Sequence, residues 1–162
     1  MMRIGQAVDI HPLVVDRPLI LGGVKIEHDK GLAGHSDADC LVHAIAESIL
    51  GALALGDLGK HFPDTDPQYK DISSMILLDH VYQLMKKQGH RIGNVDATIL
   101  AEKPKMAPFI EQMRYNIAMC LHCRVSDVSI KATRGEKLGF VGAEQGIVCT
   151  AVCLLEKELC VR

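Results

Sequence analysis

The sequence contains no tryptophan, and aromatic residues make up only 4% of its 162 positions. It lacks the run of about 20 apolar residues that a membrane-spanning helix needs. Its first residues lack the apolar segment of a signal peptide, so we expect a cytoplasmic protein, or a plastid protein whose transit peptide has been removed. Lysine and arginine are scattered and the formal net charge is −2, whereas a nucleic-acid-binding surface is strongly basic. We therefore expect binding neither to membranes nor to nucleic acids.

The composition that remains is that of an ordinary globular protein. Hydrophobic residues account for 48% and charged residues for 23% of the chain, which is unlike a disordered protein. The length suits one domain, which we expect to span residues 1–162. Cys120 and Cys123 form a C-x-x-C pair that could be half of a zinc site or a redox pair. No second such pair follows, and we interpret the six cysteines as reduced thiols in or near the core.

Residue periodicity predicts alternating strands and helices. Strands are predicted at 2–10, 94–101, 128–132 and 147–155, with two short strands around a turn within 17–26. Helices are predicted at 39–55, 71–88 and 108–121, the first after a capping-box pattern from Ser36 to Asp39. Residues 56–69 are polar and rich in turn residues, and we expect an irregular, functional loop there. The fold class is therefore α/β of the α+β type, a mixed sheet with helices packed on one face.

Asp9, His11 and His43 are the strongest candidates for a metal site. Asp9 and His11 are two residues apart at the end of the first strand, so their side chains share one face. The first helix is apolar except for a stripe of Asp39, His43 and Glu47, which must face a polar space. A carboxylate and two imidazoles form the three-ligand set of a catalytic zinc site with one open position. Alternatively, His43 is a hydrogen-bonded core histidine.

Several motifs occur in order along nearly the whole chain: Asp9-Ile10-His11, His35-Ser36-Asp37-Ala38-Asp39 with His43, Leu55 to Lys60 with Phe62 to Asp66, Lys103 to Met106, and Glu136 to Phe140. Together they resemble the methylerythritol cyclodiphosphate synthase family of the non-mevalonate isoprenoid pathway. The resemblance implies a lyase that converts 4-diphosphocytidyl-2-C-methylerythritol 2-phosphate to the cyclic diphosphate and CMP. It also implies a homotrimer of mixed α/β subunits with three active sites at subunit interfaces.

The resemblance assigns roles to individual residues. It implies zinc on Asp9, His11 and His43, a magnesium or manganese ion held by Glu136, and a transition-state-stabilising His35. Positions that match the methylerythritol phosphate site are Ser36, Asp57, Gly59, Phe62, Pro63, Asp64, Thr65 and Asp66. Positions that match the cytidine and diphosphate pocket of the neighbouring subunit are Ala101, Lys103, Pro104, Lys105, Met106, Ala107 and Thr133, and further substrate contacts match Phe140 and Ala143.

Two departures from the family pattern concern the chemistry. The threonine that partners the catalytic histidine falls on Arg134, with a threonine only at Thr133, and either neighbour could serve. Ala143 and Gln145 replace the arginine and glutamate common in the family, which weakens the case for an isoprenoid diphosphate on the trimer axis.

Two other functions fit parts of the sequence. A non-catalytic protein could hold structural zinc through Cys120, Cys123 and a histidine, and a zinc hydrolase could use the Asp9, His11 and His43 set with an activated water. The chain has no H-E-x-x-H motif, and the match to a cytidine pocket favours the synthase.

Overall fold

A computed structural model describes residues 1–158; the last four residues of the expected domain, 159–162 with Cys160, lie outside the described residues. Five strands form one mixed sheet in the order β4-β1-β7-β5-β6. Their bounds are Lys30–Leu32 for β4, Met2–Val15 for β1, Gly146–Lys157 for β7, His90–Leu100 for β5 and Val128–Thr133 for β6. Only β5 and β6 are parallel. The strands β2 (Leu19–Leu21) and β3 (Val24–Ile26) form a separate hairpin.

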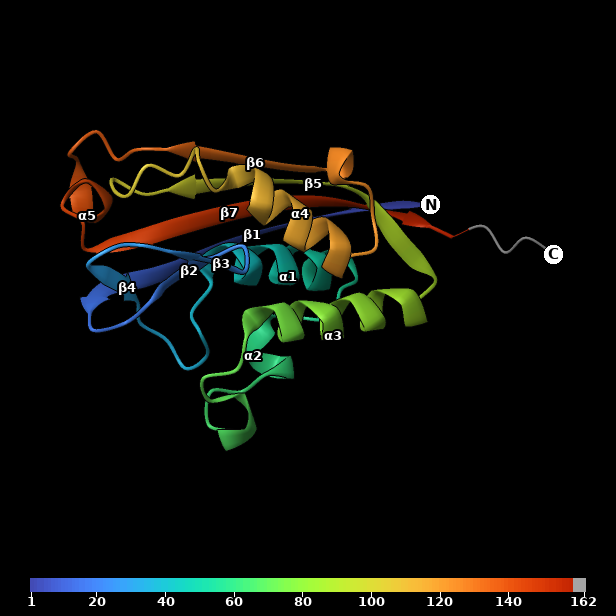
Figure 1. Cartoon of the computed structure of the whole chain (residues 1–162). Helices are drawn as coiled ribbons and strands as arrows, with labels where there is room; N and C mark the ends of the chain where they lie inside the picture. The colour runs from blue at the N-terminus through green and yellow to red at the C-terminus, as the bar shows by residue number, and fades with distance from the viewer. Residues whose placement is uncertain (159–162) are drawn as a thin grey trace.

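The three long helices lie on the same side of the sheet (Figure 1). They are α1 (Cys40–Ala52), which packs on β1 and β7, α3 (Ser74–Lys87), which packs on α1, and α4 (Ile110–Cys120), which packs on β6. Shorter pieces are α2 (Leu58–His61), α5 (Gly139–Gly142) and the 3-10 turns η1 (Pro67–Tyr69) and η2 (Val125–Asp127). The predicted mixed sheet with helices on one face is confirmed. No helix among residues 1–158 is long and apolar enough to cross a membrane.

Small residues on β1 bring α1 unusually close to the sheet. Gly5 and Ala7 are buried on the helix-facing side of β1, and a Cβ atom added at Gly5 would lie 1.9 Å from the Ser48 carbonyl oxygen of α1. Asp9 and His11 continue the same face of the strand, because side chains alternate along a strand. The close approach of α1 therefore brings His43 within reach of both.

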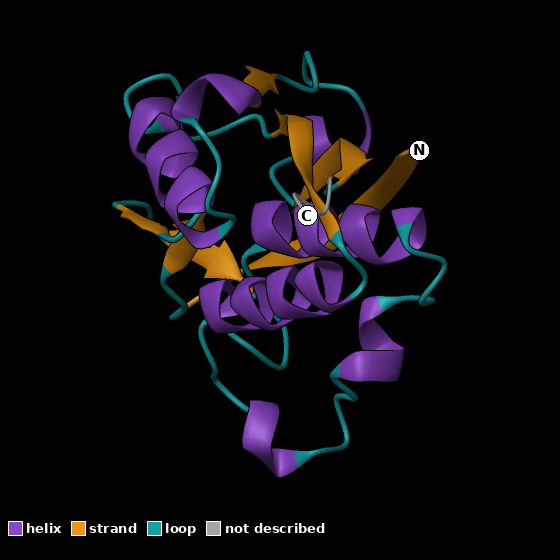
Figure 2. Ribbon diagram, turned by 90° about the vertical axis from the view of Figure 1, so that its right-hand side faces the viewer, coloured by secondary structure: helices purple, strands orange, loops and turns teal. Residues whose placement is uncertain are grey.

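Several predicted boundaries were wrong for local reasons. β1 continues beyond residue 10 because it has a partner along its whole length: β7 as far as Pro12, and then the three-residue β4. The strand β4 was not predicted. Residues 56–69 are not wholly irregular, since α2 and η1 lie within them. α2 contacts α1, and η1 lies in a loop that projects from the molecule (Figure 2). Ser36 does not cap α1: Asp39 is its N-cap, and the Ser36 hydroxyl accepts from the Ala38 N–H.

Asp39 does not face the polar space that was expected for the stripe of Asp39, His43 and Glu47. Its side chain is completely buried and accepts N–H groups of Gly22, Gly23 and Val42, so it joins the β2–β3 hairpin to the start of α1. His43 and Glu47 alone face the polar space that the stripe predicts.

The described cysteines are unpaired thiols. Cys40, Cys149 and Cys153 are buried, and Cys120 and Cys123 are half-buried, in agreement with the predicted reduced thiols in or near the core. Burial raises the pKa of Cys120 and of Cys123 to about 11, so both thiols are protonated at neutral pH and are weak nucleophiles.

Candidate metal centre and binding pockets

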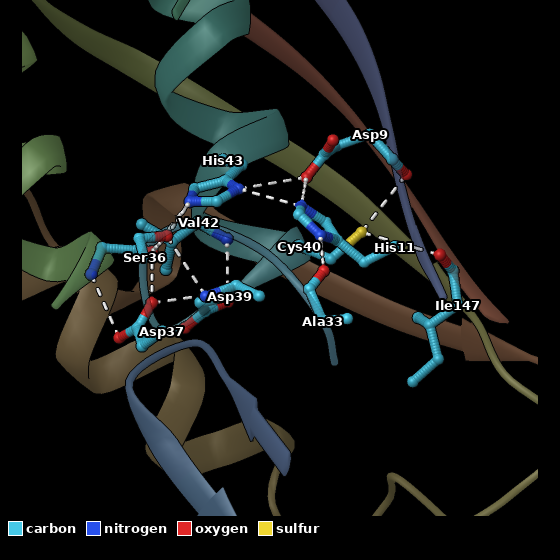
Figure 3. A network of polar contacts seen from close by, with 12 residues as sticks. Asp9, His11, Ala33, Ser36, Asp37, Asp39, Cys40, Val42, His43 and Ile147 are labelled. Carbon is cyan, nitrogen blue, oxygen red and sulfur yellow. Dashed lines mark hydrogen bonds and ion pairs between the residues drawn. The ribbon is translucent and has the colours of Figure 1, made fainter. Parts of the chain in front are cut away.

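The side chains of Asp9, His11 and His43 point toward one another across the β1–α1 contact (Figure 3). The Asp9 Oδ2 atom lies 3.0 Å from His11 Nε2 and 3.2 Å from His43 Nδ1, and the two nitrogens are 3.2 Å apart. Metal–ligand distances of about 2.0–2.1 Å place the ligands of a tetrahedral zinc ion about 3.3 Å apart. The three atoms are therefore spaced as three corners of such a site.

The hydrogen bonds behind the two imidazoles leave lone pairs facing this centre. His11 Nδ1 lies 2.7 Å from the Ala33 carbonyl oxygen, which only accepts, so Nδ1 carries the proton and Nε2 is free. His43 Nε2 lies 2.8 Å from the Ser74 hydroxyl, which donates its own proton to Asp37; Nε2 therefore donates and His43 Nδ1 is free. Three acceptor atoms in mutual contact repel one another unless a cation lies between them.

The charge state of the cluster supports the same interpretation. Without a cation between them, the two rings can take up additional protons on the nitrogens that face Asp9. Burial raises the pKa of Asp9, but hydrogen bonds from the protonated His11 and His43 rings lower it by more, so the net shift is downward. Burial lowers the pKa of His11, but the hydrogen bond and charge of Asp9 raise it by more, to above its ordinary value of 6.5. The carboxylate is therefore ionised at neutral pH and attracts positive charge to the His11 ring.

Among residues 1–158, this is the only group of three histidine, cysteine or acidic side chains close enough to share a metal. The alternative zinc site at Cys120 and Cys123 thus gains no third ligand from the described residues. The donor set and its spacing fit a metal at Asp9, His11 and His43.

A pocket of about 510 Å³ opens over the cluster, and we call it the metal pocket. Predicted site residues that line it are Asp9, His11, His35, Ser36, His43, Gly59, Phe62, Pro63 and Asp64. Glu47 was noted only as part of the polar stripe, and Leu58, Tyr69 and Leu77 of the lining were not predicted. Leu77 fits the core-facing pattern of the predicted helix 71–88, and Leu58 and Tyr69 lie in the segment that was expected to be irregular. The sequence therefore carries no signal that would single them out.

The segment between α1 and α3 forms one wall of the metal pocket. Phe62 packs edge-on against Tyr69 and His80, with ring centroids 5.4 Å and 5.3 Å away. The carboxylates of Asp57 and Asp66 accept backbone N–H groups at the starts of α2 and η1 and do not line the pocket. Asp57, Thr65 and Asp66, all predicted substrate ligands, thus lie outside the lining of the metal pocket. The contacts of Phe62 with Tyr69 and His80 hold the wall in place.

A second pocket of about 620 Å³ lies where β5 and β6 end, and we call it the β5–β6 pocket. Predicted site residues that line it are Ala101, Lys103, Pro104, Lys105, Met106, Ala107, Thr133, Arg134 and Glu136. Thr133 and Arg134 are both exposed in this pocket. Phe140 and Ala143 lie outside both linings. The two pockets share no lining residue, so one chain presents the predicted site as two separate halves.

Known proteins resemble this chain over nearly its whole length. A protein-family model described as the YgbB family matches residues 2–156, which is nearly the whole chain. The chain belongs to the YgbB family. Curated relatives include the 2-C-methyl-D-erythritol 2,4-cyclodiphosphate synthases of Clostridioides difficile (strain 630) and Chlorobium phaeobacteroides (strain BS1). The first is 61% identical over 95% of this chain and 96% of its own length, and the second is 58% identical over 97% and 99%.

Solved structures of similar proteins share the fold. The Plasmodium falciparum IspF in complex with CDP superposes with a TM-score of 0.86 at 37% identity, covering 98% of this chain and 97% of its own. The bifunctional IspDF of Campylobacter jejuni superposes with a TM-score of 0.93 at 38% identity. This chain is matched over 97% of its length but spans only 42% of that bifunctional protein.

Proposed function

We infer that this YgbB-family chain, residues 1–162 acting as one domain, is a 2-C-methyl-D-erythritol 2,4-cyclodiphosphate synthase, a lyase of the non-mevalonate isoprenoid pathway. The observation that carries this function is identity of 54–61% over 95–98% of the chain with curated enzymes of that name. The geometry of the metal pocket supports it independently. The reaction releases CMP from 4-diphosphocytidyl-2-C-methyl-D-erythritol 2-phosphate and closes the cyclic diphosphate.

In this reaction an oxygen of the 2-phosphate attacks the β-phosphorus of the diphosphate. A new P–O bond forms, the bond between the β-phosphorus and the bridging oxygen breaks, and CMP leaves with that electron pair. Nucleophile and leaving group belong to one substrate, so the protein mainly positions them and stabilises charge. Zinc on Asp9, His11 and His43, when bound, supplies a Lewis acid for the β-phosphate.

The residues of the metal pocket have further proposed roles. His35 is a transition-state stabiliser, and its Nε2 lies 3.2 Å from the Asp66 carbonyl oxygen, which fixes the ring against the pocket wall. Ser36, Gly59 and the Phe62–Asp64 part of the wall hold the methylerythritol phosphate, with Asp57, Thr65 and Asp66 as further ligands of that group.

The β5–β6 pocket is the proposed site for cytidine and the diphosphate. Residues 101–107 bind the nucleotide and Glu136 helps to hold a magnesium or manganese ion on the phosphates, with Phe140 and Ala143 as further contacts. Thr133 or Arg134 stabilises the transition state with His35. Two solved relatives are named as CDP complexes, so a cytidine diphosphate is the ligand expected here.

We propose that the chain works as a homotrimer in which the metal pocket of one subunit meets the β5–β6 pocket of the next. Two observations support this assembly. The two pockets are separate within one chain, although a single substrate must reach both. The sheet face away from the helices also leaves Ile4, Val8, Ile10 and Val152 between 47% and 73% exposed, and an apolar area of this kind is typical of a subunit interface.

The direct test is incubation of the protein with the cytidylated substrate, zinc and magnesium, with CMP release followed by chromatography. The wild-type protein should release CMP and bind one zinc per chain, and His43→Ala should lose both. Cys120→Ser with Cys123→Ser is the control, since a structural-zinc protein would lose its metal there instead. A fully active His43→Ala enzyme would refute the zinc mechanism, and sedimentation of a fully active monomer would refute the trimer.

A further inference from the structure

Ser74 is a completely buried side chain that the proposed mechanism does not use, yet it contacts a proposed metal ligand. Its hydroxyl lies 2.8 Å from His43 Nε2, on the side of the ring opposite the metal centre. The same hydroxyl donates to the Asp37 carboxylate, whose other oxygen accepts the Ser74 backbone N–H at 3.1 Å. Asp37, Ser74 and His43 therefore form a continuous chain of hydrogen bonds that ends at the candidate metal.

We propose that Ser74 is a positioning residue that holds His43 in the tautomer and orientation needed to bind zinc. Because Asp37 takes the hydroxyl proton, the Ser74 oxygen can only accept from His43, and the imidazole proton must then sit on Nε2. The lone pair on Nδ1 is thereby directed at Asp9 and His11. Outer partners of this kind typically change metal affinity 10- to 100-fold.

Ser74 is better suited to this task than Ser36, the other hydroxyl near the ring. Ser36 lies farther from Nε2, at 3.2 Å, accepts the Ala38 N–H, and lines the metal pocket. Ser74 has no exposed surface and does not line the pocket. The two serines thus have different roles. Ser74 orients His43, and the Ser36 hydroxyl remains available to a substrate in the metal pocket.

The same contact links the metal centre to the pocket wall. Ser74 is the first residue of α3, immediately after the segment that carries α2 and η1. Two backbone hydrogen bonds, from Asp71 N–H to the His35 carbonyl and from Asp37 N–H to the Ile72 carbonyl, hold the end of this segment against residues 35–37. Hydrogen bonds through Asp37 and Ser74 thus connect the end of the wall to the Nε2 side of His43.

The role of Ser74 rests on the proposed zinc site, and the following test distinguishes a failure of that role from a failure of the zinc site itself. Zinc affinity is measured by competition with a chromophoric chelator for the wild type, Ser74→Ala, Ser36→Ala and Ser73→Ala, well below their unfolding temperatures. Ser73→Ala is the matched control, because Ser73 is the exposed N-cap of α3 and, among residues 1–158, its hydroxyl forms one hydrogen bond, accepted from the Met75 N–H. A wild type that binds no zinc would refute the metal site itself.

Ser74→Ala should bind zinc 10- to 100-fold more weakly than Ser73→Ala, and Ser36→Ala should stay within about threefold of the wild type. The visible spectrum of the cobalt-loaded protein should change in Ser74→Ala and not in Ser73→Ala, because it reports the ligand geometry directly. Equal zinc affinities and equal cobalt spectra for Ser74→Ala and Ser73→Ala, beside a zinc-binding wild type, would overturn the proposal. So would a larger loss in Ser36→Ala than in Ser74→Ala.

Discussion

Replacing Gly5 with alanine should weaken both the fold and the metal centre, through a single added carbon atom. The new Cβ would lie 1.9 Å from the Ser48 carbonyl oxygen and 2.6 Å from the Ala52 nitrogen, both backbone atoms of α1. Neighbours closer than 3.0 Å must move, so β1 and α1 must separate by about 1.1 Å. Overpacking of this kind costs about 1–3 kcal/mol and occasionally more.

A shift of that size also separates His43 on α1 from its partners on β1. Metal sites tolerate distance errors of about 0.2 Å, so we expect zinc affinity to fall by at least roughly tenfold. A loss of about 3 kcal/mol would lower the unfolding temperature by roughly 6–12 °C for a chain of this length. Scanning calorimetry of the metal-free protein at fixed concentration measures the unfolding temperature, and chelator competition measures the zinc affinity.

Gly51→Ala is the matched control for Gly5→Ala. Gly51 lies on α1 near the same strand, but a Cβ there would find its nearest neighbour, the Gln6 carbonyl oxygen, at 4.0 Å. Because alanine favours a helix over glycine by about 1 kcal/mol, this variant should keep or raise the unfolding temperature. If Gly5→Ala matched Gly51→Ala in unfolding temperature and zinc affinity, close packing would not position the site.

Three further predictions concern pH, packing and chemistry. Zinc affinity should fall by up to tenfold per pH unit as the pH drops through the raised pKa of His11, because a proton then competes with zinc for Nε2 while Asp9 stays ionised. Calorimetric titration with zinc at several pH values measures this affinity, and an affinity that stays constant down to pH 6 would contradict the prediction. Asp39→Ala should lower the free energy of unfolding by at least about 2 kcal/mol, because the buried N–H groups of Gly22 and Val42 lose their acceptor, as does the N–H group of the exposed Gly23. Denaturant unfolding that shows a loss below about 1 kcal/mol would exclude this role. Thr133→Ala should lower kcat on the order of 10²-fold and more than Arg134→Ala does; wild-type turnover at saturating substrate in both variants would show that neither side chain stabilises the transition state.

The metal cluster could be predicted because its signals are local. Asp9 and His11 are two residues apart, so any strand places them on one face, and His43 with Glu47 forms a polar stripe on a mostly apolar helix. The carboxylates of Asp57 and Asp66 show the opposite case. An aspartate before a short helical turn looks the same in sequence whether it binds a ligand or caps the turn, and in the structure both accept backbone N–H groups.

The contacts that the sequence did not reveal join distant residues. Ser74 meets His43 across 31 positions, and in sequence it reads simply as part of a helix start. β4 has only three residues, too few for a periodic pattern, and exists because the far end of β1 needs a partner. The packing of Gly5 against Ser48 also depends on a helix–strand crossing that no local pattern specifies.

The central place of β7 in the sheet has a consequence for how the chain folds. β7 lies between β1 and β5, but it is the last of the described strands in chain order. Its partners on β1 are some 140 residues away, as in the pairing of Asp9 with Cys149, and contacts so distant in sequence slow folding. β4 and β6 can pair with β1 and β5 earlier, but the sheet cannot be completed before β7 has been synthesised. During translation the edges of β1 and β5 that β7 later joins therefore remain open.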